Sequence, residues 1–199
     1  MITQIAETMS TFFYRTKIIE LEEKEKSRYG MEIIISTIIG FGVIIATGSI
    51  LGHTETAVVY LLCIVPIRMY TGGYHANTYL KCNTVFAIVF LANILIYDYI
   101  IFHGLEEKLL LFTLFASVPI KRYAPVEHGN KKMTMWQKQK YKKISVFLFG
   151  FYYLVSVLLL ENGNQYGILV LLVLNTVTIL VLEVKISERI KTQNIRAYC

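Results

Sequence analysis

The sequence is poor in charge, in proline and in tryptophan. Only 17% of its 199 residues are charged, three are proline and one is tryptophan, while 55% are hydrophobic. Soluble domains contain about 25% charged and about 45–50% apolar residues. The apolar residues here also come in blocks, with a mean hydropathy of +0.51, and such blocks are typical of membrane spans. The composition excludes an ordinary soluble domain and predicts an all-α integral membrane protein.

Cysteine is scarce, and its placement excludes a disulfide framework. Of the three cysteines, Cys63 lies inside an apolar run and Cys199 is the last residue. An odd number in these positions does not pair into a scaffold. We expect no signal peptide either, because residues 1–30 are polar until Met31 and contain no apolar core. Insertion is therefore expected to rely on internal spans.

Six apolar runs cover most of the chain. A run of about 20 residues, rising about 1.5 Å per residue, matches the roughly 30 Å hydrocarbon thickness of a bilayer. Two runs are shorter and cross only if flanking polar residues are included. We predict about six transmembrane helices in a single domain, with the bundle at 31–182 and a tail at 183–199. The runs are 33–51, 57–67, 84–102, 109–120, 144–160 and 166–182.

Residues 1–30 are predicted to form an amphipathic helix. Apolar residues recur at roughly helical spacing over residues 2–28, accompanied by five lysines and arginines. A basic amphipathic helix of this kind lies on a membrane surface. Packing on the cytosolic face of the bundle explains the pattern equally well, so both interpretations stay open.

Lysine and arginine are distributed unevenly between the loops. Nineteen of the twenty lie in the N-terminal segment, in the loop at 68–82, in the stretch 121–143 and in the tail, and Lys108 is the exception. With six crossings all nineteen fall on one side, which makes both termini and the 68–82 loop cytoplasmic. The net charge of +6 thus indicates orientation in a membrane rather than nucleic-acid binding.

Charge alone does not exclude a second topology. If the runs 57–67 and 109–120 re-enter without crossing, eighteen basic residues stay inside and the 68–82 loop moves to the outer face. A reduced thiol is easier to maintain in the cytoplasm. We therefore favour six crossings, with the 68–82 loop on the cytoplasmic side.

The 68–82 loop concentrates the chemistry of the chain. It combines a thiol at Cys82, an imidazole at His75, a cation at Arg68 and the pair Gly72-Gly73. An imidazole beside a cysteine is the usual source of a thiolate nucleophile. On one straight helix these two side chains would lie about 10 Å apart. A catalytic pair therefore needs a bend, which glycine permits, with Cys82 near the start of the next span.

Other interpretations of this loop are less specific. A single cysteine is usually a small hydrophobic residue, and one histidine with one cysteine does not complete a metal site. We therefore expect no metal and no cofactor. Asn77 or Asn83 is a candidate for orienting His75, and the sequence selects neither. The basic stretch 121–143 is either a positive-inside anchor or a site for an acidic peptide.

Two motifs resemble the AgrB family, the accessory gene regulator B proteins. The first comprises Arg68, Gly73, His75-Ala76 and Cys82 between two apolar runs. The second is Lys121-Arg122-Tyr123-Ala124-Pro125, followed by Asn130-Lys131. Chain length, the six runs and the basic N-terminus are also similar, so that the resemblance spans nearly the whole chain.

The resemblance implies a membrane cysteine endopeptidase of bacterial quorum sensing. Such proteins remove the C-terminal tail of a short precursor peptide, AgrD, and help to close a lactone or thiolactone ring. By position, Cys82 is the expected nucleophile and His75 its base, while Arg68 and Gly73 serve substrate binding or loop shape. The implied partners are an AgrD-like precursor, the bacterial cytoplasmic membrane and a second copy of the chain.

Two alternatives of other classes remain. A small transporter or channel, one that exports a peptide for example, would place polar residues along the span interiors, where Asn93 and Asn175 are among the few present. A membrane adaptor would tolerate substitution throughout the 68–82 loop. In either case Cys82 would be dispensable.

Overall fold

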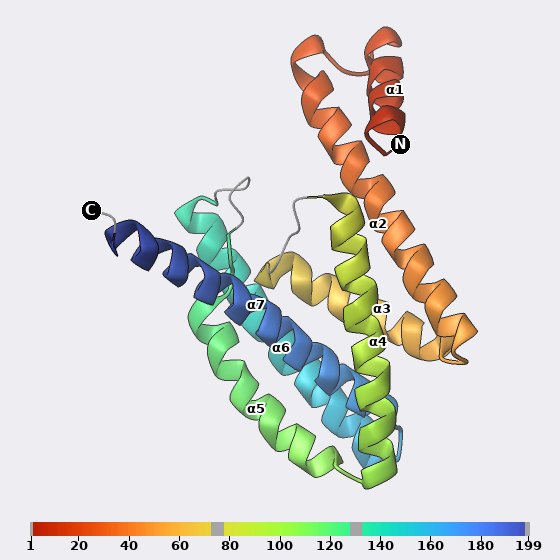
Figure 1. Ribbon diagram of the computed structural model, residues 1–199, viewed down its shortest axis with the longest axis vertical. Helices are drawn as coiled ribbons and strands as arrows, with labels where there is room; N and C mark the ends of the chain where they lie inside the picture. The colour runs from red at the N-terminus through yellow and green to blue at the C-terminus, as the bar shows by residue number, and fades with distance from the viewer. Residues whose placement is uncertain (1, 73–77, 128–132, 198–199) are drawn as a thin grey trace.

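The computed structural model describes residues 2–72, 78–127 and 133–197, with side chains through 190. This part of the chain is all-helical, as predicted (Figure 1). Four segments are long and apolar enough to cross a membrane: Leu21–Ile50, Tyr79–His103, Met135–Glu161 and Tyr166–Ile190. The elements are α1 (Ile2–Arg15), the short 3-10 helix η1 (Leu21–Glu23), α2 (Lys24–Ile50), α3 (Thr54–Thr71), α4 (Tyr79–His103), α5 (Glu106–Tyr123), α6 (Met135–Glu161) and α7 (Tyr166–Ala197).

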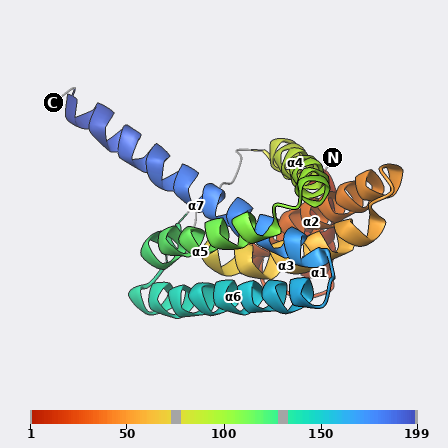
Figure 2. The same ribbon diagram turned by 90° about the horizontal axis from the view of Figure 1, so that it is seen from below.

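Helix α7 is the centre of the bundle. Residues 168–174 are all buried, which means that every face of the helix is covered over these two turns. A helix that is apolar all round is suited to this position. Helices α3, α4, α5 and α6 all pack against α7. Its C-terminal part continues past the other helices and projects from the bundle (Figure 2).

Two pairs of polar side chains bond to one another inside the bundle. Asn93 on α4 is buried and donates to Thr176 Oγ1 on α7 at 3.1 Å. Asn175 on α7 donates to Thr113 Oγ1 on α5 at 2.6 Å. Asn93 thus faces protein rather than lipid, because an amide in hydrocarbon needs a polar partner.

Contacts between neighbouring helices fix their directions. Glu32 and Ser36 on α2 pair with Tyr79 and Asn83 on α4 in the same order, so these two helices run parallel. The order of contacts likewise makes α5 parallel to α7 and α3 antiparallel to α6. Thr113 with Asn175 and Ala116 with Thr178 give the direction of α5 relative to α7. Leu62 with Tyr152 and Tyr70 with Tyr141 give that of α3 relative to α6.

The α2–α3, α4–α5 and α6–α7 turns lie at one end of the bundle (Figure 1). His53, beside the α2–α3 turn, approaches Asp98 near the end of α4 at 3.5 Å. Glu55, at the start of α3, accepts a short hydrogen bond from Tyr166, at the start of α7. The connections that precede α4 and α6, at residues 72–78 and 124–134, therefore begin and end at the opposite end (Figure 1).

Residues 2–28 form more than the one helix expected from the sequence. Helix α1 ends at Arg15, a turn and η1 follow, and α2 starts at Lys24. Lys17 has a positive φ of 57° in that turn. The small residues Ala6 and Ser10 lie one turn apart and are fully buried, so α1 packs closely on α2. The basic residues between 24 and 28 thus belong to α2. Two of them, Lys24 and Arg28, form ion pairs with Glu7 on α1.

Candidate functional site

The last turn of α3 brings the first half of the site to the bundle end. Thr71 is fully buried, and its hydroxyl donates to the carbonyl of Ile67 at 3.0 Å. Gly72 caps the helix with φ 70° and ψ −156°, and its amide donates to the carbonyl of Arg68. Glycine alone adopts this backbone conformation readily. Helix α3 is therefore capped at Gly72 in a conformation that favours glycine, while the stretch between His75 and Thr78, where the catalytic pair needs a bend, lies partly outside the described residues.

The start of α4 carries the second half. Thr78 is the N-cap, and its hydroxyl accepts a hydrogen bond from the amide of Lys81 at 3.3 Å. Cys82 is the fourth residue of the helix, and its amide donates to the carbonyl of Thr78 at 3.0 Å. Helix geometry leaves the amides of Tyr79 and Leu80 without an intrahelical acceptor. Cys82 thus lies near the start of a candidate span, which is the position that the catalytic interpretation requires.

Arg68 and Cys82 line the same small pocket. The rest of its lining is apolar and comes from α3, α4 and α7: Ile64, Val85, Phe86, Val89 and Leu180. Cys82 itself is half-buried. The structure therefore brings the predicted cation and the predicted nucleophile together, at one end of a largely apolar cavity.

Three of the predicted site residues lie outside the described residues. Gly73, His75 and Asn77 belong to the stretch between Gly72 and Thr78. Their roles stay predictions. The alternative orienting residue, Asn83, packs on α2 and donates to the carbonyl of Ser36 at 3.3 Å.

The segment after α5 joins the site through backbone contacts. The amide of Val126 donates to the carbonyl of Thr71 at 2.9 Å. A Cβ placed on Gly72 would lie 2.3 Å from the carbonyl oxygen of Val126, which shows how closely the two backbone segments approach. The segments around the two motifs that carried the resemblance thus meet in space, at Thr71 and Val126, which are 55 positions apart in the chain.

Glu127 anchors this segment to α6. Its carboxylate accepts a hydrogen bond from the Met133 amide at 2.8 Å and pairs with Lys138 at 2.9 Å. The hydrogen bond from Lys138, followed by the one from Met133, lowers the pKa of Glu127. A further contact places the Arg189 guanidinium of α7 over the Tyr123 ring of α5, 6.0 Å from its centroid.

Sequence reasoning did not assign Thr71, Val126 or Glu127 to the site. Their contribution is a set of contacts between segments far apart in the chain, and such contacts leave no local pattern. The one available signal was the second motif, which ends at Pro125, directly before Val126. No group of three or more metal-ligating side chains occurs among the described residues.

Comparison with known proteins gives one family. The family model described as accessory gene regulator B matches residues 5–182. A relative from Clostridium perfringens (strain 13 / Type A), named "Putative AgrB-like protein 2", is 24% identical over 143 residues, covering 69% of this chain and 67% of the relative. No solved structure matches this chain.

Proposed function

Because the chain belongs to the accessory gene regulator B family, we propose that it is a membrane cysteine endopeptidase of bacterial quorum sensing. Its substrate is a short AgrD-like precursor, from which it removes the C-terminal tail while promoting closure of a lactone or thiolactone ring. The observation that carries the proposal is the placement of Cys82 at the start of α4, in one pocket with Arg68.

The reaction begins with transfer of the Cys82 thiol proton to His75. The thiolate attacks the peptide carbonyl that will end the ring, and a tetrahedral oxyanion forms. Collapse of this intermediate breaks the C–N bond, and the imidazolium returns the proton to the departing amine. The tail leaves, and the rest of the precursor is held as a thioester on Cys82.

Ring closure follows by exchange at the thioester. A thiol or hydroxyl within the bound peptide attacks the acyl carbon, and the Cys82 thiolate is the leaving group. One thioester is replaced by a thiolactone, or by a lactone, at little cost in free energy. Water would release a linear peptide instead, and the apolar lining of the Cys82 pocket supports the exclusion of water.

The remaining loop residues position the reaction. Arg68 offers a guanidinium that binds a carbonyl or carboxylate of the substrate. Gly72 and Gly73 let the backbone reverse between α3 and α4. Asn77 orients the imidazole of His75, since the side chain of Asn83 is directed to α2.

We also propose six crossings with both termini in the cytoplasm. Helices α3 and α5 have 18 residues each, a length of about 27 Å, close to the hydrocarbon thickness. Successive helices from α2 to α7 alternate in direction, which supports this topology. It places the reaction on the cytoplasmic side of the bacterial membrane, where the protein acts as a homodimer.

The test is cleavage of a synthetic precursor by the purified protein in nanodiscs. The peptide is the one encoded by a small neighbouring reading frame, with an amphipathic start, a central Cys or Ser and an acidic tail. Release of the tail should be lost in Cys82→Ala, slowed in His75→Ala and retained in Cys63→Ala, a control at a buried thiol. Cleavage by Cys82→Ala would refute the proposed nucleophile.

A further inference from the structure

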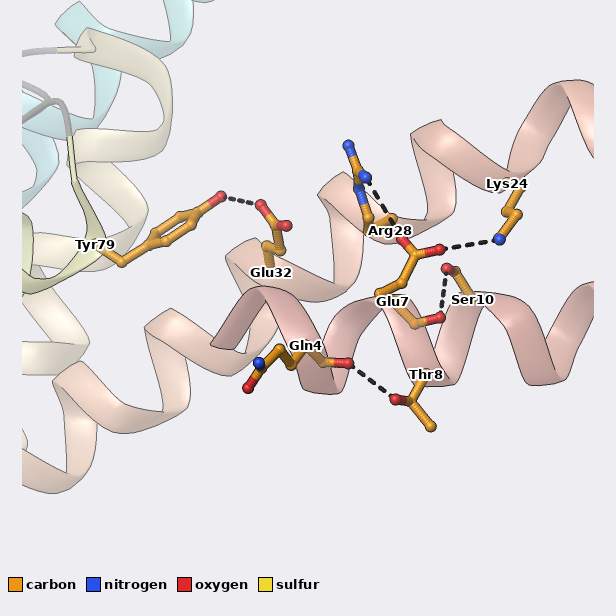
Figure 3. Close-up of polar contacts among 8 residues, drawn as sticks. All are labelled: Gln4, Glu7, Thr8, Ser10, Lys24, Arg28, Glu32 and Tyr79. Carbon is orange, nitrogen blue, oxygen red and sulfur yellow. Dashed lines mark hydrogen bonds and ion pairs between the residues drawn. The ribbon is translucent and has the colours of Figure 1, made fainter. Parts of the chain in front are cut away.

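A tyrosine–carboxylate contact holds the start of α4 against α2. The Tyr79 hydroxyl donates to Glu32 Oε2 at 2.7 Å, and both residues are half-buried (Figure 3). Tyr79 is the first residue of α4 and precedes Cys82 by three positions. A hydrogen bond to an ionised carboxylate is among the stronger kinds in proteins. The contact therefore acts at the helix end that carries the thiol.

A second contact on the same face fixes the rotation of this helix end. Asn83, one turn after Tyr79, donates to the carbonyl of Ser36 on α2. A Cβ placed on Gly40 would lie 3.1 Å from Asn83 Oδ1, so the two helices approach closely here. At about 100° per residue, Cys82 projects roughly a quarter turn away from this face. Rotation of α4 about its axis would carry the thiol away from the pocket that it lines with Arg68.

The α2 side of the contact is itself braced by α1. Glu7 on α1 pairs with Lys24 at 2.9 Å and with Arg28 at 3.4 Å, both on the first turns of α2 (Figure 3). Glu32 is one turn beyond Arg28. The N-terminal helix pair thus forms a support for Glu32, although this part of α2 extends beyond the helices around α7 (Figure 1).

Helix ends fray unless side-chain contacts hold them, and a nucleophile must stay within a fraction of an ångström of its productive position. We propose that the Glu32–Tyr79 pair is a positioning contact, which fixes the first turns of α4 and aims the Cys82 thiol into the pocket shared with Arg68. Its catalytic consequence rests on the proposed function, and its structural consequence does not.

Alkylation of the full-length protein in nanodiscs tests the structural consequence. The rate of iodoacetamide modification is measured separately at Cys82 and Cys63 by peptide mass spectrometry. In Tyr79→Phe and Glu32→Leu, Cys82 should react about tenfold faster, because the thiol leaves its pocket. Cys63, which is buried on α3, should keep its wild-type rate. Glu32→Gln retains an acceptor oxygen and should restore most of the protection.

Matched controls separate positioning from general effects of substitution. Tyr99→Phe removes a hydroxyl from the far end of α4, and Glu25→Gln changes an exposed carboxylate of α2. Both should leave the Cys82 rate within about twofold of wild type. The proposal is overturned if Tyr79→Phe behaves as these controls do. It is also overturned if Cys63 and Cys82 accelerate together, since that reports loosening of the whole bundle.

Precursor cleavage tests the catalytic consequence. Tyr79→Phe should lower kcat about tenfold, a loss on the order of 1.4 kcal/mol, and leave KM within about twofold, because the peptide still binds. The two proposals fail separately. Faster Cys82 alkylation with no cleavage by wild type would refute the peptidase and keep the contact. Cleavage by wild type with unchanged alkylation in Tyr79→Phe would refute the contact alone.

Discussion

At Gly72 both the backbone conformation and the packing of a distant segment require glycine. Its φ of 70° and ψ of −156° lie in a region that costs other residues on the order of 1–3 kcal/mol. A Cβ there would also overlap the carbonyl oxygen of Val126 at 2.3 Å. Both effects act at the end of α3, one turn after Arg68.

Gly72→Ala should therefore lower the unfolding temperature of the protein in detergent and reduce cleavage by more than tenfold. The matched substitution is Gly150→Ala inside α6, where a Cβ would meet nothing within 4 Å. Alanine is favoured over glycine in a helix interior by about 1 kcal/mol, so this variant should be as stable as wild type or more stable. Equal unfolding temperatures for the two variants would contradict the role assigned to Gly72.

The sequence predicted some features of individual site residues. The Gly72-Gly73 pair was expected to permit a bend, and the positive φ at Gly72 is compatible with that expectation. The role of Val126 was not predictable, because it is a backbone contact with Thr71 across 55 positions of the chain. Local propensity contains no information about such a pairing.

Among the helices, the contact between α4 and α7 depends on polar side chains within the bundle. Asn93 and Thr176 exchange two hydrogen bonds, at 3.1 and 3.2 Å. Such pairs contribute roughly 0.6–2 kcal/mol in membrane proteins. A double-mutant cycle with Asn93→Ala and Thr176→Val, read by unfolding in mixed micelles, should give a coupling energy of about 1 kcal/mol. Strict additivity would contradict the contact.

The connection between α5 and α6 should loosen in acid. The Lys138 and Met133 hydrogen bonds lower the pKa of Glu127 below its ordinary value of 4.5. The stabilisation is therefore complete above pH 4.5 and is lost as the pH falls through the lowered pKa. Hydrogen-exchange protection of the Met133 amide should decrease over that interval, whereas Glu127→Gln should show no such step. A step of equal size in both proteins would contradict the assignment.

The limits of helices were harder to predict from the sequence than their existence. The pattern over residues 2–28 indicated one amphipathic helix, yet the chain reverses after Arg15 and re-enters a helix at Lys24. Periodicity alone does not show such a break, because apolar residues recur at roughly helical spacing on both sides of it. The ion pairs of Glu7 with Lys24 and Arg28 exist only because the two helices pack side by side.

For the molecule as a whole, six apolar runs predicted the order of the six larger helices. The central place of α7 was not predictable, because the run 166–182 is no more distinctive than its neighbours. Its burial depends on which helices surround it, and that follows from tertiary packing. Four segments meet the length and hydropathy of a span, and the crossing of α3 and α5 belongs to the proposed topology.

Labelling with a membrane-impermeant maleimide tests the proposed topology. In a background with Cys63, Cys82 and Cys199 replaced by alanine, single cysteines are placed at Lys81, at Asn164 and at Lys185. Asn164→Cys, in the α6–α7 turn, should label in intact cells, and the other two only after permeabilisation. Labelling of Lys81→Cys from outside would contradict six crossings and favour the re-entrant arrangement.

The most direct test of the central claim is the mass of the protein after reaction with a precursor whose ring-closing Cys or Ser is replaced by alanine. This peptide cannot close its ring, so the thioester on Cys82 should accumulate. We predict an adduct equal to the precursor without its tail, mapped to Cys82, absent in Cys82→Ala and released by hydroxylamine. Tail release from this peptide with no adduct on Cys82, or an adduct on another residue, would contradict the acyl-enzyme mechanism.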